Sequence, residues 1–269
     1  MKQRRTILAF CWICLAAAPL LAQWQNVAPG IDYAEYALST PNNVFVARMA
    51  RSAQNCYIES SIPMGVWGVA RETVSGMAQR YQDAIGYWGS NWGTRHNVVV
   101  AINGDFFDYA TSLPLSGQVH SGWHCKRFED LTGVSGFVWR TDRSLFIGDC
   151  VYTNPAKQIV KYQATGQNQA LADLNVPPGT NQITLYMPQF GANTGTDNTV
   201  DEVLVQLDSP ALIKPSPAYV RGTVIEVRPK LGSMRLPFDC VVLCARGTAA
   251  TKLLANATVG SEVRLSQEI

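Results

Sequence analysis

Short apolar runs separated by turn residues recur along most of the chain, and this pattern predicts many short β-strands. The clearest runs give expected strands at 133–139, 145–151, 158–162, 183–187, 201–207, 219–227, 240–245 and 262–265. Residues 24–51 are also strand-like between turn residues, and 57–61 form a further short candidate. The pattern therefore favours a β-rich fold.

Helical spacing occurs in two places. From Thr73 to Ile85, apolar residues recur three or four positions apart, and Thr73 is suited to cap the N-terminus. A second, shorter helix is expected at 248–257. The expected fold class is therefore α+β, a β-rich mixed domain with few helices, in which residues 171–268 are a candidate inserted β subdomain.

An unbroken apolar run extends from Val98 to Ile102. Its β-branched residues predict a strand buried on both faces. It ends at Asn103-Gly104, a strong turn signal in which we expect Gly104 to adopt a conformation that a Cβ disfavours. A plain hairpin with solvated carboxylates is the alternative interpretation.

Two carboxylates, Asp105 and Asp108, bracket Phe106 and Phe107 just after this turn. Burial of a phenylalanine ring stabilises a fold by about 1.5–3 kcal/mol, so we expect both rings to point into the core. The neighbouring polar groups would then line a pocket at the end of the strand.

The first residues have the order of a secretory signal peptide. Lys2, Arg4 and Arg5 precede a short apolar stretch, and Ala22 is the small residue before the expected cleavage site. The segment is short for a membrane span, which needs about 20 residues, although an uncleaved N-terminal anchor is an alternative. We therefore expect a secreted, periplasmic or cell-envelope protein with no stable membrane span.

Composition excludes one class of partner. The formal charge of the whole chain is +2, and removal of residues 1–22 takes away three positive charges, which leaves about −1. No basic patch remains to attract nucleic acid. With 47% hydrophobic and 16% charged residues, the mature chain can form one large core.

Five cysteines follow the expected cleavage site, and export permits disulfides. Cys240 and Cys244 should share one face of a strand about 13 Å apart, too far for a bond to each other. Cys125 and Cys150 are the preferred pair, which would link the segment after the turn to a following strand.

The stretch A-I-N-G-D-F-F-D (101–108), followed by P-L-S-G-Q-V-H-S-G (114–122), resembles the phosphodiester glycosidase family. Its members include the lysosomal "uncovering enzyme", which removes N-acetylglucosamine from a phosphodiester. Weaker matches follow in order at 183–196 and 220–227. The residues on the central pattern are Asn103, Gly104, Phe106, Phe107, Gly117 and Gly122.

The resemblance implies hydrolysis of a sugar-1-phosphodiester or a related exopolysaccharide linkage. Carboxylates usually stabilise the oxocarbenium-like transition state and activate water in such reactions. The expected catalytic residues are Asp108, Asp105 and Asn103, although many relatives carry Gly at position 105. The amide of Asn103 suits either a sugar hydroxyl or the turn itself.

The residues expected to bind substrate are Gly104, Gly117, His120 and Thr194. No cofactor is firmly implied by the sequence, and a requirement for a divalent cation is an open alternative. The four-residue spacing of His120 and His124 suggests a metal-dependent hydrolase as one alternative. Another alternative is a non-catalytic carbohydrate-binding envelope protein.

The family pattern continues beyond the strand at 262–265 with Gly-rich strands and an acidic D-G-G-G-S segment. No such segment occurs in this sequence. We therefore expect a C-terminally incomplete bacterial member of the family, in which part of the pocket is missing.

Overall fold

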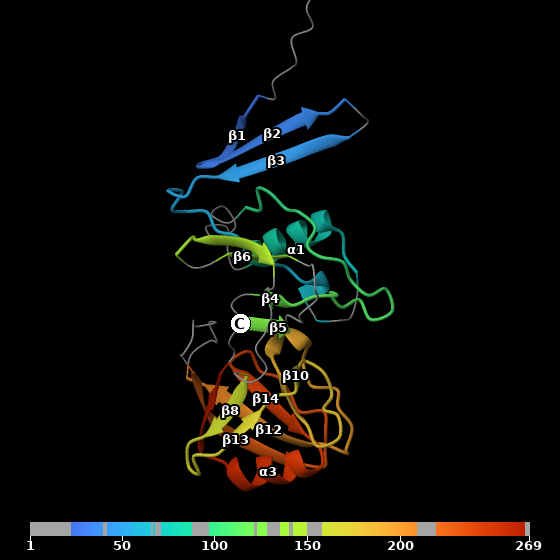
Figure 1. Cartoon of the computed structure of the whole chain (residues 1–269), viewed down its shortest axis with the longest axis vertical. Coiled ribbons are helices and arrows are strands. Elements are labelled where there is room, and N and C mark those ends of the chain that lie inside the picture. The colour runs from blue at the N-terminus through green and yellow to red at the C-terminus, as the bar shows by residue number, and fades with distance from the viewer. Residues whose placement is uncertain are drawn as a thin grey trace, which may run out of the picture. The chain divides into compact units, whose positions relative to one another are not determined.

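The computed structural model describes residues 23–39, 42–65, 67, 71–87, 97–120, 123–127, 135–139, 142–149, 158–208 and 219–266. The chain divides into two compact units, 1–56 and 57–269. The first unit contains β1 (Gln25–Ala28), β2 (Ile31–Ala37) and β3 (Asn43–Met49), which form an antiparallel sheet in chain order. Figure 1 shows these strands in blue. They confirm the strand-like interpretation of 24–51.

The second unit carries the remaining elements. In chain order they are η1 (Pro63–Gly65), α1 (Val74–Tyr87), β4 (Gln118–His120), β5 (Trp123–Lys126), β6 (Ser135–Trp139), β7 (Leu145–Asp149), β8 (Ile159–Tyr162), β9 (Asn168–Ala170), β10 (Asp173–Leu174), β11 (Ile183–Tyr186), η3 (Pro188–Phe190), β12 (Asp201–Leu207), β13 (Val220–Pro229), β14 (Cys240–Ala245), α3 (Thr248–Asn256) and β15 (Glu262–Leu265). The described part of the chain is thus rich in strands with two α-helices, as expected for a β-rich mixed fold.

An eight-stranded sheet dominates the second unit. Its order is β10-β11-β14-β12-β13-β15-β8-β9, and all pairings except β10 with β11 are antiparallel. The two edge strands, β9 and β10, are consecutive in the chain and separated by Leu171 and Ala172. The sheet therefore curls until its edges are joined by this short link; we call it the curled sheet.

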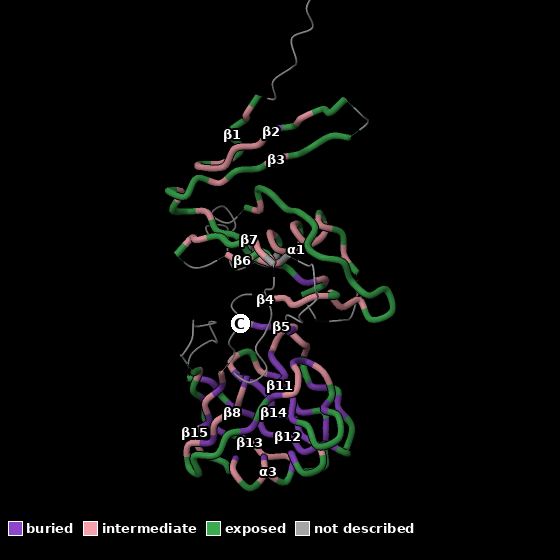
Figure 2. The backbone as a smooth tube through the Cα atoms, in the orientation of Figure 1, coloured by how far each residue is buried: buried purple, intermediate pink, exposed green. Residues whose placement is uncertain are grey.

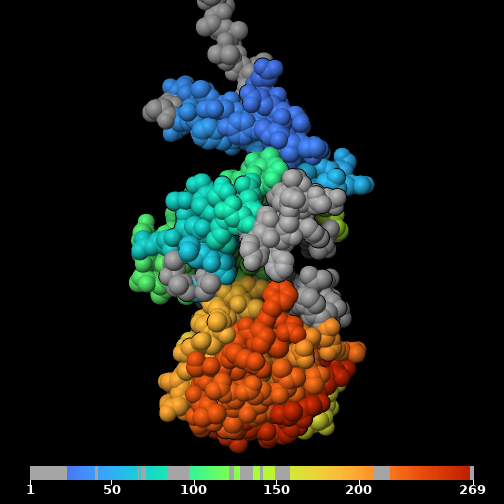
Figure 3. Space-filling model, turned by 180° about the vertical axis from the view of Figure 1, so that it is seen from behind, coloured from blue at the N-terminus to red at the C-terminus, as the bar shows by residue number. Residues whose placement is uncertain are grey.

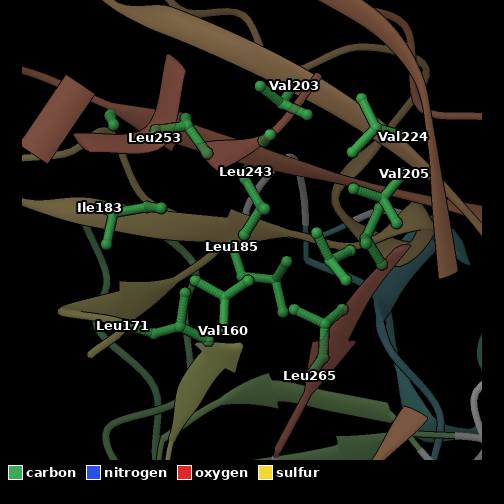
Figure 4. Close-up of a cluster of buried hydrophobic side chains, with 14 of the residues drawn as sticks. Val160, Leu171, Ile183, Leu185, Val203, Val205, Val224, Leu243, Leu253 and Leu265 are labelled. Carbon is green, nitrogen blue, oxygen red and sulfur yellow. The ribbon is translucent and has the colours of Figure 1, made fainter. Parts of the chain in front are cut away.

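Aliphatic side chains fill the inside of the curled sheet. Figure 4 shows ten of them pointing toward one another: Val160, Leu171, Ile183, Leu185, Val203, Val205, Val224, Leu243, Leu253 and Leu265. Leu253 belongs to α3, whose buried face also includes Ala249 and Ala250. Each fully buried aliphatic side chain contributes about 1.5–3 kcal/mol, so this cluster is the main source of stability.

The outer face of the curled sheet is also covered, over part of its area. On β14, Val241, Leu243 and Ala245 belong to the inner cluster, whereas Cys240 and Cys244 join a second cluster outside. Burial on both faces explains why β14 is a continuous apolar run. The shared face of the two cysteines confirms the expectation from their spacing.

The predicted helix at 73–85 is confirmed as α1. Thr73 precedes it, and its Oγ1 accepts a hydrogen bond from the backbone N–H of Gly76 at 3.1 Å, as expected for an N-cap. The helix predicted at 248–257 is α3. The strands predicted from 133 onward correspond to β6, β7, β8 and β11 to β15, whereas β9 and β10 were not predicted.

The predicted buried strand from Val98 to Ile102 is wrong. Residues 97–104 adopt no regular secondary structure, and the Ile102 side chain is 84% exposed. Residues 97–104 are exposed at all positions but one, whereas the labelled strands β12 and β14 of the curled sheet are largely purple in Figure 2. A buried strand needs a paired neighbour and a covering layer, and no described strand pairs with this run. The short strand expected at 57–61 is also absent.

The expected burial of the two phenylalanines is wrong as well, because Phe106 is 79% and Phe107 38% exposed. The Phe107 ring contacts the Tyr109 ring, with centroids 5.1 Å apart, instead of the aliphatic core. Gly104 does not occupy the left-handed region, and a Cβ there would meet nothing within 4 Å. The turn therefore does not require glycine at this position.

Several expectations concern residues that are not described. The signal peptide (1–22), Cys150 and Gly122 lie outside the described residues. No disulfide joins two of the described cysteines. In the described part of the chain, no helix is long and apolar enough to cross a membrane. The curled sheet starts at β8, earlier than the boundary proposed for an inserted subdomain.

Candidate functional site

Asp108 organises the loop that carries the predicted catalytic residues. Phe107 and Pro114 form an isolated antiparallel bridge, and Asp108 N donates to Leu113 O at 2.8 Å. Inside this hairpin, Asp108 Oδ1 accepts hydrogen bonds from the backbone N–H groups of Ala110 and Thr111, both at 2.8 Å. We call residues 105–115 the acidic loop.

These bonds fix the charge as well as the position of Asp108. The backbone N–H of Thr111, its hydroxyl and the N–H of Ala110 lower the pKa of the Asp108 carboxyl below its usual value. The carboxylate therefore stays ionised near neutral pH. All three bonds go to Oδ1, at up to 3.1 Å, and leave Oδ2 for other partners.

The other two predicted catalytic residues are exposed on the same segment. Asp105 Oδ1 accepts a hydrogen bond from the adjacent Phe106 N–H at 2.7 Å. Asn103 and Gly104 are exposed in the irregular segment before it. The structure thus places Asn103, Asp105 and Asp108 on one exposed stretch of chain, where only Asp108 has a network that fixes its carboxylate.

Two cations contact the acidic loop. The Lys126 Nζ donates to the carbonyls of Pro114 and Leu115, at 2.7 and 3.2 Å. The Arg71 guanidinium lies 4.9 Å from the ring centroid of Tyr109 and donates to the Tyr109 carbonyl at 3.4 Å. These two contacts place positive charge beside the carboxylates of the loop.

A short hairpin, β4 with β5, follows the acidic loop. Gly117 lies directly before β4, and His120 ends it opposite Trp123. His120 is half-buried, and its Nδ1 lies 2.6 Å from the backbone carbonyl of Ser60. Gly117 and His120 thus follow the acidic loop directly in the chain, on a hairpin that the sequence did not predict.

The proposed pairing of His120 with His124 as metal ligands fails on geometry. His120 pairs with Trp123, whereas His124 pairs with Val119, so the two imidazoles leave opposite faces of the hairpin. His124 is completely buried, and burial, with the nearby Arg127 charge, lowers its pKa to about 4. No group of three potential metal-ligating side chains occurs among the described residues.

The hairpin is attached to the curled sheet by buried polar contacts. The side-chain amide of Asn175 donates to Cys125 O and accepts from Met187 N, both at 2.9 Å. Arg127 donates to the carbonyls of Leu171 and Ala172, which form the link between the two sheet edges. The curled sheet therefore provides a rigid support for β5.

Thr194 lies in a different environment from the other predicted residues. Its side chain is buried, and its hydroxyl donates to Glu202 Oε1 at 2.5 Å. Thr196 donates to the same oxygen at 2.8 Å, and Met234 N donates to Glu202 Oε2 at 3.0 Å. The Thr194 hydroxyl is therefore engaged in holding its own loop to the curled sheet.

Sequence reasoning missed four polar residues of this region: Glu59, Ser60, Arg71 and Lys126. Each lies in a segment without a motif. Each contacts the site through residues far away in the sequence, which the sequence alone does not reveal. Lys126 is the partial exception, because it follows the His-Cys pair at 124–125.

Comparisons with known proteins bear on the fold alone. No family model and no curated protein matches the chain. A hypothetical protein from Synechocystis is similar in structure, with a TM-score of 0.53 and 15% identity over 92% of this chain and 41% of that protein. A protein of Burkholderia pseudomallei K96243, named a putative exported protein, gives a TM-score of 0.51 and 16% identity over 88% of this chain and 46% of its own. The chain therefore spans less than half the length of these two proteins and shares their fold over most of its own length.

Proposed function

We propose that this protein is an exported hydrolase that cleaves a sugar-1-phosphodiester at the acidic loop. One observation carries the proposal: the ionised carboxylate of Asp108 is held on a loop that Arg71 and Lys126 both contact. A sugar phosphodiester needs a carboxylate for the developing positive charge on the sugar and cations for the phosphate. The similarity of 101–108 and 114–122 to the phosphodiester glycosidase family points to the same substrate class.

Export is part of the proposal. It is supported by the signal-peptide pattern of residues 1–22 and by the name of the Burkholderia protein that shares the fold. N-terminal sequencing of the protein from the medium or the periplasm should begin at Gln23. A mature protein that begins at Met1 would contradict it.

The direct test removes the charge of Asp108 and leaves the loop intact. In Asp108→Asn the side-chain oxygen still accepts the bonds from Ala110 and Thr111, so the hairpin should persist. The substrate is an N-acetylglucosamine 1-phosphodiester with a phenyl group on the phosphate, and free sugar is measured. We expect a loss of about 100-fold in kcat, the usual size for one electrostatic contact to a transition state.

A matched control is Asp83→Asn on α1, an exposed carboxylate that accepts a hydrogen bond from Gln79. This variant should hydrolyse the phosphodiester at the wild-type rate. Arg71→Gln and Lys126→Gln should raise KM, because each removes a cation beside the phosphate. Full activity of Asp108→Asn would contradict the assignment of the acidic loop as the site.

A second candidate function, carbohydrate binding without turnover, has one observation in its favour. The rings of Phe106 and Tyr109 are 79% and 74% exposed on the acidic loop. Exposed aromatic rings can stack on the apolar faces of sugars. Calorimetric binding of sugar phosphates without any release of sugar, lost in Tyr109→Ala, would favour this function over hydrolysis.

A further inference from the structure

The contact between His120 and Ser60 fixes which imidazole nitrogen carries a proton. His120 Nδ1 lies 2.6 Å from the Ser60 carbonyl oxygen, which can only accept a hydrogen bond. Nδ1 must therefore be the protonated nitrogen of the neutral ring. The Ser60 hydroxyl is 3.2 Å from the same nitrogen, but it donates to Val119 O at 2.5 Å. The lone pair of the neutral imidazole thus resides on Nε2.

A carboxylate lies behind the ring, on the side of Nδ1. Glu59 Oε1 is 3.9 Å from His120 Nδ1. The Ser60 carbonyl and the Glu59 carboxylate therefore both lie on the Nδ1 side of the ring. Cys125 is the other titratable group beside this residue. Burial raises the pKa of its thiol to about 12, so the thiol adds no charge.

Nε2 is the other nitrogen of the His120 ring. The His120 side chain is 22% exposed, and Nε2 has no hydrogen-bond partner among the described residues. His124 differs in each respect, since it is completely buried on the opposite face of the hairpin and its low pKa keeps it neutral. The Nε2 lone pair of His120 is thus suited to accept a proton, whereas His124 is part of the protein interior.

The same hairpin reaches the acidic loop. Gln118, two positions before His120, pairs with Lys126, whose ammonium group holds the carbonyls of Pro114 and Leu115. The hairpin is in turn fixed to the curled sheet through Asn175. His120 and the acidic loop are therefore supported by one rigid element.

We propose that His120 is the proton-transfer residue of the hydrolysis, with Nε2 as its reacting atom and with Ser60 O and Glu59 as positioning groups. The inference rests on the proposed function. Nε2 takes a proton from water as the water oxygen bonds to the anomeric carbon. The bond from that carbon to the phosphate oxygen breaks, and its electron pair leaves with the phosphate monoester. The imidazolium then returns its proton to solvent or to the released phosphate.

Kinetics of His120→Gln on the phenyl phosphodiester tests the role directly. We expect kcat to fall 100-fold or more with KM within threefold, because general-base catalysis contributes about 10²–10⁴-fold. Glu59→Gln should lower kcat less than His120→Gln does and leave KM unchanged, because the contact between His120 Nδ1 and Ser60 O remains. Glu226→Gln, a carboxylate on β13 paired with Arg228, is the control and should leave kcat and KM unchanged. His120→Gln within threefold of the wild-type kcat would overturn the proposal.

Chemical labelling distinguishes failure of this inference from failure of the proposed function. Diethyl pyrocarbonate acylates accessible, unprotonated imidazole nitrogens, and fragmentation of the labelled peptide separates His120 from His124. We expect His120 to be labelled and His124 not, with His120 protected by N-acetylglucosamine 1-phosphate. A wild type that is inactive on the phosphodiester would end the proposed function, while protection would still place His120 at a sugar-phosphate site. An unlabelled His120, or labelling that the sugar phosphate does not slow, would overturn the inference.

Discussion

Thr194 donates a hydrogen bond to Glu202 over 2.5 Å, and both side chains are buried between the curled sheet and the loop that covers its outer face. Glu202 also accepts bonds from Thr196 and from the backbone N–H of Met234. A buried carboxylate with three donors is a structural anchor, because removing it takes the shared acceptor away from all three donors. One residue of β12 thus helps to hold the segment 191–197, together with backbone bonds between Thr194 and Met234 and between Leu236 and Ala192.

Glu202→Ala should therefore destabilise the protein strongly. Each unsatisfied buried donor costs about 1–3 kcal/mol, and the substitution leaves up to three of them. Urea unfolding monitored by tryptophan fluorescence measures the change. Glu226→Ala on β13 removes an exposed carboxylate and should change the free energy of unfolding by at most about 0.5 kcal/mol. Equal stabilities of the two variants would contradict the anchoring role.

A pair of apolar substitutions tests where the core lies. Leu243→Ala removes a fully buried side chain from the inside of the curled sheet and should cost about 2–5 kcal/mol. Ile102→Ala removes a side chain that is 84% exposed and should be nearly neutral. Denaturant midpoints report both. A loss from Ile102→Ala as large as that from Leu243→Ala would mean that the run from Val98 to Ile102 is buried after all.

Six of the eight strands of the curled sheet were predicted from the sequence, because these strands are buried on both faces or alternate cleanly, but the sheet itself and its strand order were not. β12, β14 and α3 are examples in which local pattern and tertiary environment agree. The run from Val98 to Ile102 has the same composition but no paired strand, and composition cannot report the presence of a partner. β9 and β10 were missed because they have three and two residues, too few for a periodic signal.

The candidate site was predictable only where a motif marked it. Asp105, Asp108 and His120 were proposed from residue type, position and the resemblance to the phosphodiester glycosidase family, and they stay proposals. Ser60 was not, because its contribution to His120 is a backbone carbonyl, which any residue provides. Thr194 illustrates the opposite error. A polar residue in a Gly-rich loop is easily taken for a substrate-binding residue, but the hydroxyl of Thr194 is bonded to the buried Glu202.

Two glycines should respond differently to the same substitution. Gly232 has φ of +65°, and a Cβ there would lie 2.3 Å from the carbonyl oxygen of Asp197. Gly232→Ala should cost at least about 1–3 kcal/mol, the usual range for a strained non-glycine backbone. Gly104→Ala should be nearly neutral, because a Cβ there meets nothing within 4 Å. Thermal melts of the two variants measure this, and a larger loss from Gly104→Ala would contradict the described turn.

The buried His124 should make the stability of the fold decrease at acidic pH. Its pKa is lowered from 6.5 to about 4 in the folded state, mainly by burial. Between these values the unfolded chain binds a proton that the folded chain does not, so stability falls as the pH drops from 6.5 to about 4. The slope from this one group is at most about 1.4 kcal/mol per pH unit. Urea midpoints at pH 7 and pH 5 should therefore differ less in His124→Gln than in the wild type. An identical difference in both proteins would show that His124 is accessible to protons in the folded state.

Hydrolysis of the phenyl phosphodiester of N-acetylglucosamine in ¹⁸O-labelled water tests the proposed function most directly, because it identifies the bond that breaks. Attack at the anomeric carbon places the label in the sugar and releases an unlabelled phosphate monoester. Attack at phosphorus places the label in the phosphate instead. Mass spectrometry of both products from the wild type, with Asp108→Asn as the inactive reference, should find the label in the sugar. Label in the phosphate, or no hydrolysis at all, would contradict the assignment of the protein as a phosphodiester glycosidase.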